Sequence, residues 1–214
     1  MRLNPAAFDQ FLEGVGQQVL WRQSNACACV NPQSGQPDPK HQLCSGKGRL
    51  WAAPVQTVTG VASQDTINDL SQQGLWETGD MVLVIPQSSV LWNAGQFDRV
   101  TMLNSTDVFS QPLVRGTPAD RLIFPVAELT RVFWLNPANR NQIIEGAIPV
   151  VEPSGQLVWP GGVGEPPPGV AYSVTGTKYS EYFIWNKLTS DRGEHSGARL
   201  PKKLVARRFD LFNR

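Results

Sequence analysis

Apolar side chains recur at helical spacing near the N-terminus. The stretch opens with Asn4 and Pro5, a typical helix start, because an Asn side chain caps the first turn and proline lacks the N–H that this turn leaves unpaired. The apolar residues that follow lie three or four positions apart: Phe8, Leu12, Val15 and Val19. We predict an amphipathic helix over residues 5–22, whose apolar side packs either on its own domain or on a neighbouring subunit.

From residue 50 onward, short apolar runs alternate with turn residues such as Gly79-Asp80 and Gly116-Thr117. This spacing is typical of a mainly β protein, a small antiparallel β-barrel or sandwich. Only residues 65–74 indicate a further helical turn. The predicted strands lie at residues 50–58, 80–86, 99–103, 111–115, 122–126, 129–135, 171–179, 181–185 and 200–211.

All three cysteines and one of the two histidines lie close together in the sequence. Cys27 and Cys29 form a C-x-C pair, and twelve residues after Cys29 come His41 and Cys44 as H-x-x-C. Two short-spaced pairs separated by a loop are typical of a structural zinc site, in which each pair supplies two ligands from one tight turn. Because three thiolates and one imidazole fill all four tetrahedral positions, we predict a closed, structural Zn²⁺ site.

The residues around these pairs fit a loop that is ordered by a metal. The segment Ser45–Gly48 allows positive φ and can turn backbone N–H groups toward a cysteine sulfur. Several prolines and Gly35 exclude a regular helix or strand between the pairs. The alternatives are unrelated buried thiols beside a surface histidine, and an iron–sulfur cluster, which usually takes four cysteines.

A change in composition marks a long loop at residues 136–169. Its segment Gly161–Gly169 is rich in glycine and proline, so we expect no regular element there. No Gly-Lys-Ser/Thr sequence follows, and prolines lack the N–H donors of a phosphate cradle, so we interpret it as a linker or contact loop. We therefore divide the chain into residues 1–50, with the helix and zinc-binding loop, and residues 51–214, a β-barrel-like domain with the long loop and a basic C-terminal strand.

Composition indicates a globular chain. A hydrophobic content of 41% with 17% charged residues is not that of a disordered protein, and 214 residues suffice for a sizeable core. Cysteines that are all assigned to a metal fit a reducing compartment. We see no apolar signal-peptide core and no run that approaches a membrane span, so we expect a protein of the cytosol, or one assembled there.

Charge is unevenly distributed along the chain. Residues 178–214 carry nine Lys/Arg against four Asp/Glu, a net +5, and the other residues carry ten against fourteen, a net −4, which gives the overall +1. A basic tail strand can face nucleic acid or an acidic partner surface, or it can be an edge strand that lysines protect from aggregation. We favour the last two interpretations over a DNA contact.

No catalytic motif emerges, and we expect no enzyme. The zincin motif, the nucleophile elbow and the Walker loop are missing from the sequence. His195, with Asp191 and Glu194 nearby, is a candidate acid–base group, but a polar loop rich in glycine and serine is typical of a surface histidine. Cysteines that bind a metal cannot act as nucleophiles.

The segment from Cys27 to Trp51 resembles a motif of small neck proteins (head–tail connector or head-closure proteins) of tailed bacteriophages. In that motif a Cys-x-Cys pair, a loop like Ser34–Pro39 and a second metal pair are followed by Gly-x-Gly and an aromatic residue. His41 stands where such proteins often have a cysteine, a change that zinc tolerates. The preceding helix, the run of short strands and the basic strand near the C-terminus add to the resemblance.

This resemblance implies a structural protein of the virion, assembled in the host cytoplasm. The chain would form a homo-oligomeric ring between portal or adaptor and tail proteins, around the channel through which DNA passes. Seven tryptophans and long loops fit large contact surfaces. A ring uses heterologous interfaces, in which one patch meets a different patch of the next subunit, and the loop 136–169 is a candidate for such contacts.

Two other function classes remain open from the sequence. A zinc-stabilised nucleic-acid-binding module would use the basic C-terminus and exposed aromatic residues as its binding surface. A metal-dependent hydrolase with a divergent motif would need an open coordination position, and ligation of the metal by all four residues would exclude it. The segment Cys44–Gly48 also echoes half of the zinc repeat of J-domain co-chaperones, but it occurs as one copy where that family has several.

Overall fold

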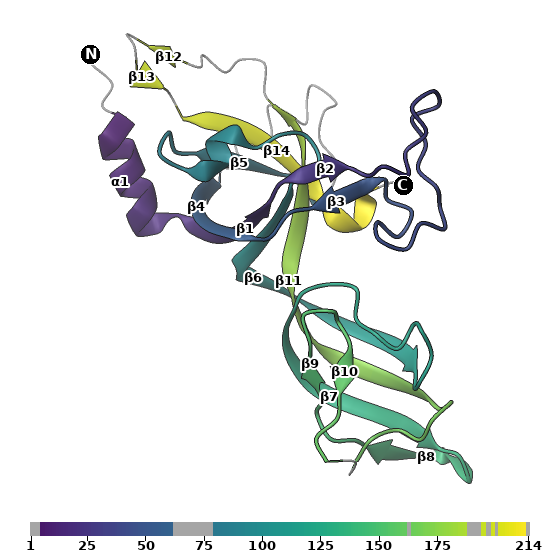
Figure 1. Cartoon of the computed structure of the whole chain (residues 1–214). Helices are drawn as coiled ribbons and strands as arrows, with labels where there is room; N and C mark the ends of the chain where they lie inside the picture. The colour runs from purple at the N-terminus through teal and green to yellow at the C-terminus, as the bar shows by residue number, and fades with distance from the viewer. Residues whose placement is uncertain are drawn as a thin grey trace. The chain divides into compact units, whose positions relative to one another are not determined.

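The computed structural model describes residues 5–61, 79–161, 164–187, 194–195, 198–199 and 201–212. The helical turn predicted at residues 65–74 lies outside these ranges. Figure 1 labels the helix and the strands. In chain order the elements are α1 (Pro5–Val15), β1 (Gln17–Arg22), β2 (Ser24–Ala26), β3 (Arg49–Trp51), β4 (Val55–Val61), β5 (Met81–Ile85), the 3₁₀ turn η1 (Val90–Asn93), β6 (Arg99–Val114), β7 (Val126–Asn136), β8 (Asn139–Glu145), β9 (Val150–Val151), β10 (Leu157–Val158), β11 (Ala171–Lys187), β12 (Glu194–His195), β13 (Ala198–Arg199), β14 (Lys202–Arg208) and the 3₁₀ turn η2 (Phe209–Leu211).

The chain forms two compact units. Unit 1 contains Met1–Asn104 and Glu181–Arg214, and unit 2 contains Ser105–Ser180. The long strands β6 and β11 cross this division, so each contributes one part to each unit. The division does not coincide with the boundary that we placed after residue 50, because β1 pairs with both β4 and β6.

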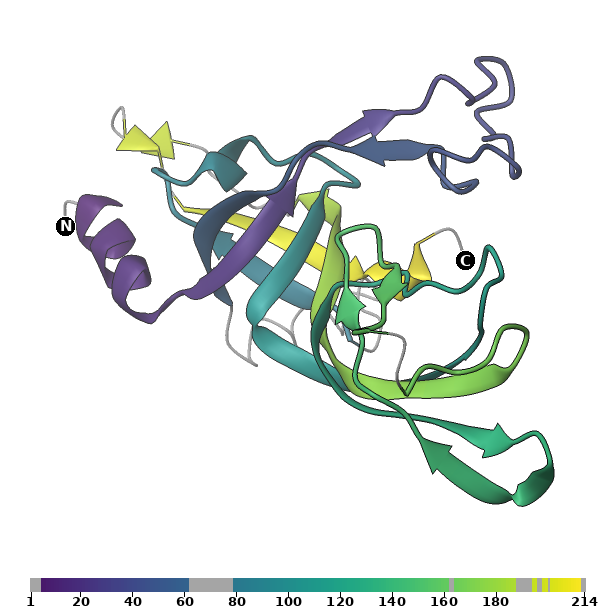
Figure 2. The ribbon, with the colours of Figure 1, turned by 60° about the horizontal axis from the view of Figure 1, so that its bottom comes forward.

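Unit 1 is a closed, six-stranded antiparallel β-barrel (Figures 1 and 2). Its strand order is β14-β5-β4-β1-β6-β11, and β11 pairs with β14 to close the barrel, which leaves no free edge. Alternate residues point inward, as expected for strands. The interior residues are Val19, Leu83, Ile85, Leu91, Val100, Met102, Ile184, Leu204 and Ala206. The prediction of a mainly β protein with a small antiparallel barrel is confirmed.

The predicted helix 5–22 is wrong beyond residue 15. α1 ends at Val15, and residues 17–22 form strand β1, with Val19 fully buried in the barrel. At Gly16, whose N–H bonds to the carbonyl of Leu12, a Cβ would lie 2.4 Å from that carbonyl and 2.5 Å from Cγ1 of Val58. Only glycine therefore fits where the helix turns into the strand.

Unit 2 is a sheet of the order β6-β11-β7-β8 that is covered on one face. The two-stranded ribbon β9–β10 and the segment before β7 supply the cover. The core of this unit contains Phe109, Leu113, Leu122, Val132, Trp134, Leu157, Trp159, Tyr172 and Val174. On the opposite, outer face of the sheet, Cζ of Arg131 lies 4.5 Å from the ring centroid of Phe133, and Arg131 forms an ion pair with Glu145.

Several strands are longer, or differently placed, than predicted. Residues 99–103 and 111–115 belong largely to the single strand β6, and residues 171–179 and 181–185 to β11. Residues 122–125 form no strand. The predicted loop 136–169 contains β8, which pairs with β7 through a tight turn, and the short ribbon β9–β10. Residues 164–169, which include the three prolines, are irregular as predicted.

Candidate metal centre

The four predicted metal ligands lie at the end of a two-stranded ribbon. β2 and β3 pair antiparallel, with Ser24 opposite Trp51 and Ala26 opposite Arg49. The loop between them closes at its base, where the N–H of Cys27 donates to the carbonyl of Gly48 at 2.9 Å. We call β2, β3 and the loop 27–48 the metal ribbon; Figure 2 shows the loop at the end of the two strands.

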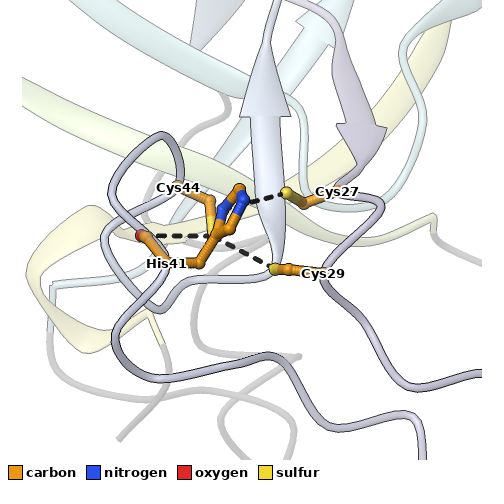
Figure 3. A group of neighbouring side chains, drawn as sticks. All are labelled: Cys27, Cys29, His41 and Cys44. Atoms are coloured by element: carbon orange, nitrogen blue, oxygen red, sulfur yellow. Dashed lines mark hydrogen bonds between the residues drawn. The ribbon is translucent and has the colours of Figure 1, made fainter.

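The structure brings the four side chains together, as Figure 3 shows. Nδ1 of His41 lies 3.5 Å from Sγ of Cys27 and 3.5 Å from Sγ of Cys44, and Sγ of Cys29 lies 3.5 Å from Sγ of Cys44. All four ligand atoms lie within 4.8 Å of one another. The three cysteines form no disulfide. Residues that are seventeen positions apart at most therefore share one potential metal site.

These distances fit a tetrahedral metal ion. With Zn–S of about 2.3 Å and Zn–N of about 2.05 Å, a tetrahedron holds sulfur and nitrogen about 3.6 Å apart and two sulfurs about 3.8 Å apart. The observed separations are close to these values, and the most distant donors would need to approach by at most about 1 Å. The residues lie close enough to bind a metal ion, and the donor set is compatible with zinc. Coordination through Nδ1 would leave Nε2–H of His41 as a hydrogen-bond donor.

The backbone turns sharply just after Cys44, in the second ligand pair. Ser45, Gly46 and Gly48 have positive φ, of 50°, 75° and 69°, as the sequence predicted. Burial raises the pKa of the Cys44 thiol, but the backbone N–H of Gly48 and the ring of His41 outweigh it and lower the pKa to about 6. This anionic character of Cys44 is what a metal ligand requires.

Cys29 differs from Cys44 in its surroundings. Burial, followed by the hydrogen bond with Cys27, raises the pKa of Cys29 to about 11. Without a metal, the cluster therefore favours one thiolate at Cys44 and a protonated thiol at Cys29. A divalent cation would favour the thiolate form of both cysteines, because its positive charge stabilises neighbouring thiolates.

The long loop between the ligand pairs is ordered by its own hydrogen bonds. The side chain of Asn31 accepts from the backbone N–H groups of Gln33 and Ser34, and the N–H of Gly35 donates to the carbonyl of Asn31. The loop returns to the first pair through the N–H of Asp38, which lies 3.4 Å from the carbonyl of Cys29. Turn geometry thus carries the chain from Cys29 to His41 without a helix or strand.

A buried carboxylate joins the metal ribbon to the barrel. Asp98, only 2% exposed, precedes β6 and accepts three hydrogen bonds. The donors are the N–H of Ser24 at 2.7 Å, Nε1 of Trp21 at 2.8 Å and the N–H of Gly95 at 3.0 Å. One side chain therefore fixes the end of β1, the start of β2 and the turn before β6.

An aromatic cluster also contacts the base of the ribbon. Trp51 lies with its ring centroid 5.3 Å from that of Phe209 and 5.7 Å from that of Phe212, both close to the C-terminus. Nε1 of Trp51 donates to the carbonyl of Phe97, whose φ is +71°. The members of this aromatic cluster are Trp51, Phe97, Phe183, Phe209 and Phe212.

Cations stack on the aromatic cluster. Cζ of Arg49 lies 4.4 Å from the ring centroid of Phe97, and Cζ of Arg99 lies 4.1 Å from that of Phe209. Nζ of Lys47, within the second ligand turn, lies 5.2 Å from the same Phe209 ring. These contacts connect the metal loop to the C-terminal turn. Sequence reasoning found the ligands but missed this support, because its residues are far apart in the chain and follow no motif.

A further candidate from the sequence is the acid–base group of His195 with Asp191 and Glu194. Glu194 and His195 form the short strand β12 with β13, and Asp191 lies outside the described residues. The structure does not describe the side chains of this segment. Among the described residues, no helix has the length and apolar character needed to cross a bilayer.

Comparison with protein-family models and with curated proteins finds no match for this sequence.

Proposed function

We propose that the metal centre is a structural zinc site. Its support is the donor set of three sulfurs and one imidazole nitrogen, which occupies every position of a tetrahedron. Zinc binding worth roughly 10–16 kcal/mol would contribute directly to the folding of the metal ribbon. The residues around the site form turns, and several of them make cation–aromatic contacts that connect the ribbon to the barrel. Such surroundings are typical of a structural metal site.

We further propose that the chain is a structural subunit of the neck of a tailed bacteriophage. In this role, copies form a ring around the DNA channel and join portal or adaptor proteins to tail proteins. The observation that carries the proposal is that residues 27–51, which carry the resemblance to neck proteins, fold as one metal ribbon docked on a β-barrel. The segment that carries the resemblance is therefore one structural element of unit 1.

Exposed apolar side chains support an assembling role. Leu12 on α1 is buried on its own unit, whereas Phe11, 60% exposed, and Val15 lie four residues apart on a second side of the helix. The helix therefore packs on its own domain through Leu12. Phe11 and Val15 leave a second apolar surface that a neighbouring subunit could contact. Further exposed apolar residues lie on the metal loop and in unit 2: Leu43, Val108, Ile123, Ile143 and Val150.

The alternative of a nucleic-acid-binding module is less well supported. Its binding surface would be the basic strand β14, but Nζ of the buried Lys202 donates to the carbonyl of Trp92. Arg207 forms an ion pair with the buried Asp80, with Nη2 and Oδ2 3.0 Å apart. Two of the cations that suggested a DNA contact therefore serve the barrel itself.

Native mass spectrometry of the protein purified without added metal tests both proposals. We expect one zinc ion per chain and a ring whose mass is a whole multiple of the subunit mass. A protein without bound zinc would contradict the structural zinc site. Cryo-electron microscopy of virions that contain the chain should then place the ring between portal and tail; a position elsewhere in the particle would contradict the neck assignment.

A further inference from the structure

Two arginines lie directly opposite each other on the barrel. Arg22 is the last residue of β1, and its Cα partner on β6 is Arg99. Their neighbours Trp21 and Val100 pack in the barrel interior, so by alternation both arginine side chains lie on its outer face. Because like charges opposite each other on paired strands repel, this position calls for negative charge close by.

Glu181 lies near both arginines, but its carboxylate is bound to Arg99. Oε1 accepts from Nε of Arg99 at 2.7 Å and from Oγ1 of Thr101 at 3.0 Å, and Oε2 accepts from Nη2 of Arg99. Among the described residues, none forms an ion pair with Arg22. The carboxylate of Glu181 therefore neutralises one arginine and leaves the charge of the other unpaired.

The guanidinium of Arg22 is half-buried without compensation. Its Nε is enclosed by the protein and has no hydrogen-bond partner in the described part of the chain, whereas its Nη groups are not enclosed. A buried donor without a partner is rare in folded proteins, and an unseen water or ion is one of the few explanations. An anion at the open Nη edge would offset both the lost hydration and the repulsion from Arg99.

A third cation lies in the same region. Cζ of Arg99 and Nζ of Lys47 lie 4.1 Å and 5.2 Å from the centroid of one ring, that of Phe209. Burial, and after it the positive charge of Arg99, lowers the pKa of Lys47 and that of Arg22. Arg22, Lys47 and Arg99, which we call the cation cluster, thus repel one another around a carboxylate that is already bound.

We propose that the cation cluster binds a phosphate group, with Arg22 as its principal contact. The two Nη groups of a guanidinium match two phosphate oxygens, and the remaining oxygens and charge of the phosphate face the other cations. A carboxylate offers two oxygens in one plane and a single charge, which suits three surrounding cations less well. The phosphate is either free or part of a nucleic-acid backbone. This site does not depend on the proposed ring.

Isothermal titration of inorganic phosphate into the full-length protein, in chloride buffer, tests the site. We expect Arg22→Gln to weaken binding by about tenfold or more, because a charge-assisted bidentate contact is lost. Arg22→Lys keeps the charge without the planar fork and should weaken binding less. Arg140→Gln, at an exposed position of β8, removes the same charge and should leave the affinity unchanged.

Thermal unfolding shows whether the variants fold and gives a second readout. In chloride, Arg22→Gln should unfold at or above the wild-type midpoint, because a repulsion is removed. Phosphate should raise the midpoint of the wild type and of Arg140→Gln more than that of Arg22→Gln. A general salt effect is common to all three proteins and cancels in this comparison.

The outcomes separate the possible ligands. Equal phosphate affinity in the wild type and in Arg22→Gln, or no binding to either, would overturn the site and leave the ring proposal untouched. Acetate that binds as tightly as phosphate would identify a carboxylate site and overturn the phosphate assignment. If a single-stranded oligonucleotide displaces phosphate from the wild type, the site takes a nucleic-acid backbone; if phosphate binds and is not displaced, the site takes free phosphate or a small phosphate ester.

Discussion

At the scale of single residues, Asp98 determines how the metal ribbon meets the barrel. Its carboxylate accepts hydrogen bonds from Ser24, Trp21 and Gly95, and it is almost fully buried. A buried carboxylate is tolerated only with such a set of donors, so its position and those of its partners depend on one another. The Cys/His cluster and Asp98 thus lie at opposite ends of the same short ribbon.

We predict that Asp98→Asn destabilises the protein by about 2–3 kcal/mol, because an amide NH₂ group would replace an acceptor oxygen and face N–H donors. Chemical denaturation monitored by tryptophan fluorescence measures this change. Asp38→Asn is the matched control, since Asp38 accepts from Lys40 on the exposed loop and its replacement should cost less than about 0.5 kcal/mol. Equal losses in both variants would contradict the anchoring role of Asp98.

Removing one ligand tests the metal centre directly. Cys27→Ser should release the metal and loosen the loop 27–48, because the three remaining donors bind zinc far more weakly. The barrel should stay folded, since its core lies on other strands. Zinc analysis together with hydrogen exchange measures both effects. Leu43→Ser, at an exposed position of the same loop, should keep the metal. Unchanged zinc content in Cys27→Ser would exclude Cys27 as a ligand.

That the three cysteines and His41 come together could be predicted from the sequence, and the contacts that support them could not. Cys27, Cys29, His41 and Cys44 lie within one stretch whose spacing is itself the signal. Asp98 is separated from Ser24 by 74 residues, and nothing in its local sequence distinguishes it from a surface aspartate. Contacts of this kind depend on which strands become neighbours, which a single sequence does not reveal.

At the scale of elements, helix and strand periods overlap around residues 15–19. Val15 and Val19 are four apart, which extends the helical pattern, but Val19 lies in β1, where the barrel buries it. Ser105 and Ser180 lie in the gaps between the predicted strands 99–103 and 111–115 and between 171–179 and 181–185. In the structure they lie within β6 and β11, and their hydroxyl oxygens are 3.2 Å apart on paired strands. A strand continues through polar residues when backbone pairing and a side-chain partner are both available.

In unit 2, a polar network holds the turn after β6. Asp120 accepts from the hydroxyl of Tyr172, from Nη1 of Arg115 at 3.2 Å and from the N–H of Gly116 at 2.9 Å. Arg115 also pairs with Glu165, in the segment with three prolines. Burial, and next the hydrogen bond to Asp120, raises the pKa of Tyr172 well above its ordinary value. The network therefore depends on the protonated hydroxyl of Tyr172.

This shift predicts sensitivity to alkaline pH. A tyrosine whose folded pKa is raised contributes stability that is fully present below its unfolded pKa of about 10 and is lost as pH rises above it. Tyr172→Phe should cost about 1–3 kcal/mol at neutral pH, because Asp120 loses a donor. Its unfolding midpoint should then fall less steeply than that of the wild type between about pH 9 and 11. Tyr179→Phe is the control, and equal slopes in all three proteins would contradict the prediction.

At the scale of the whole molecule, two strands serve two units. β6 leaves unit 1 after Asn104, and β11 returns to it at Glu181, so unit 2 is an insertion between two paired strands of the barrel. Unit 1 has its own core, its own closure and the complete metal ribbon. Unit 2 has a core of its own. The barrel and the candidate metal centre are thus both confined to unit 1.

This arrangement predicts the outcome of removing unit 2. Joining Asn104 to Glu181 through a two-residue Asn-Gly turn should leave a folded barrel, because the antiparallel β6 and β11 strands then become a hairpin. The shortened protein should bind one zinc ion, because all four candidate ligands lie in unit 1. Circular dichroism and zinc analysis measure the two properties. A shortened protein that fails to fold would show that the barrel depends on the core of unit 2.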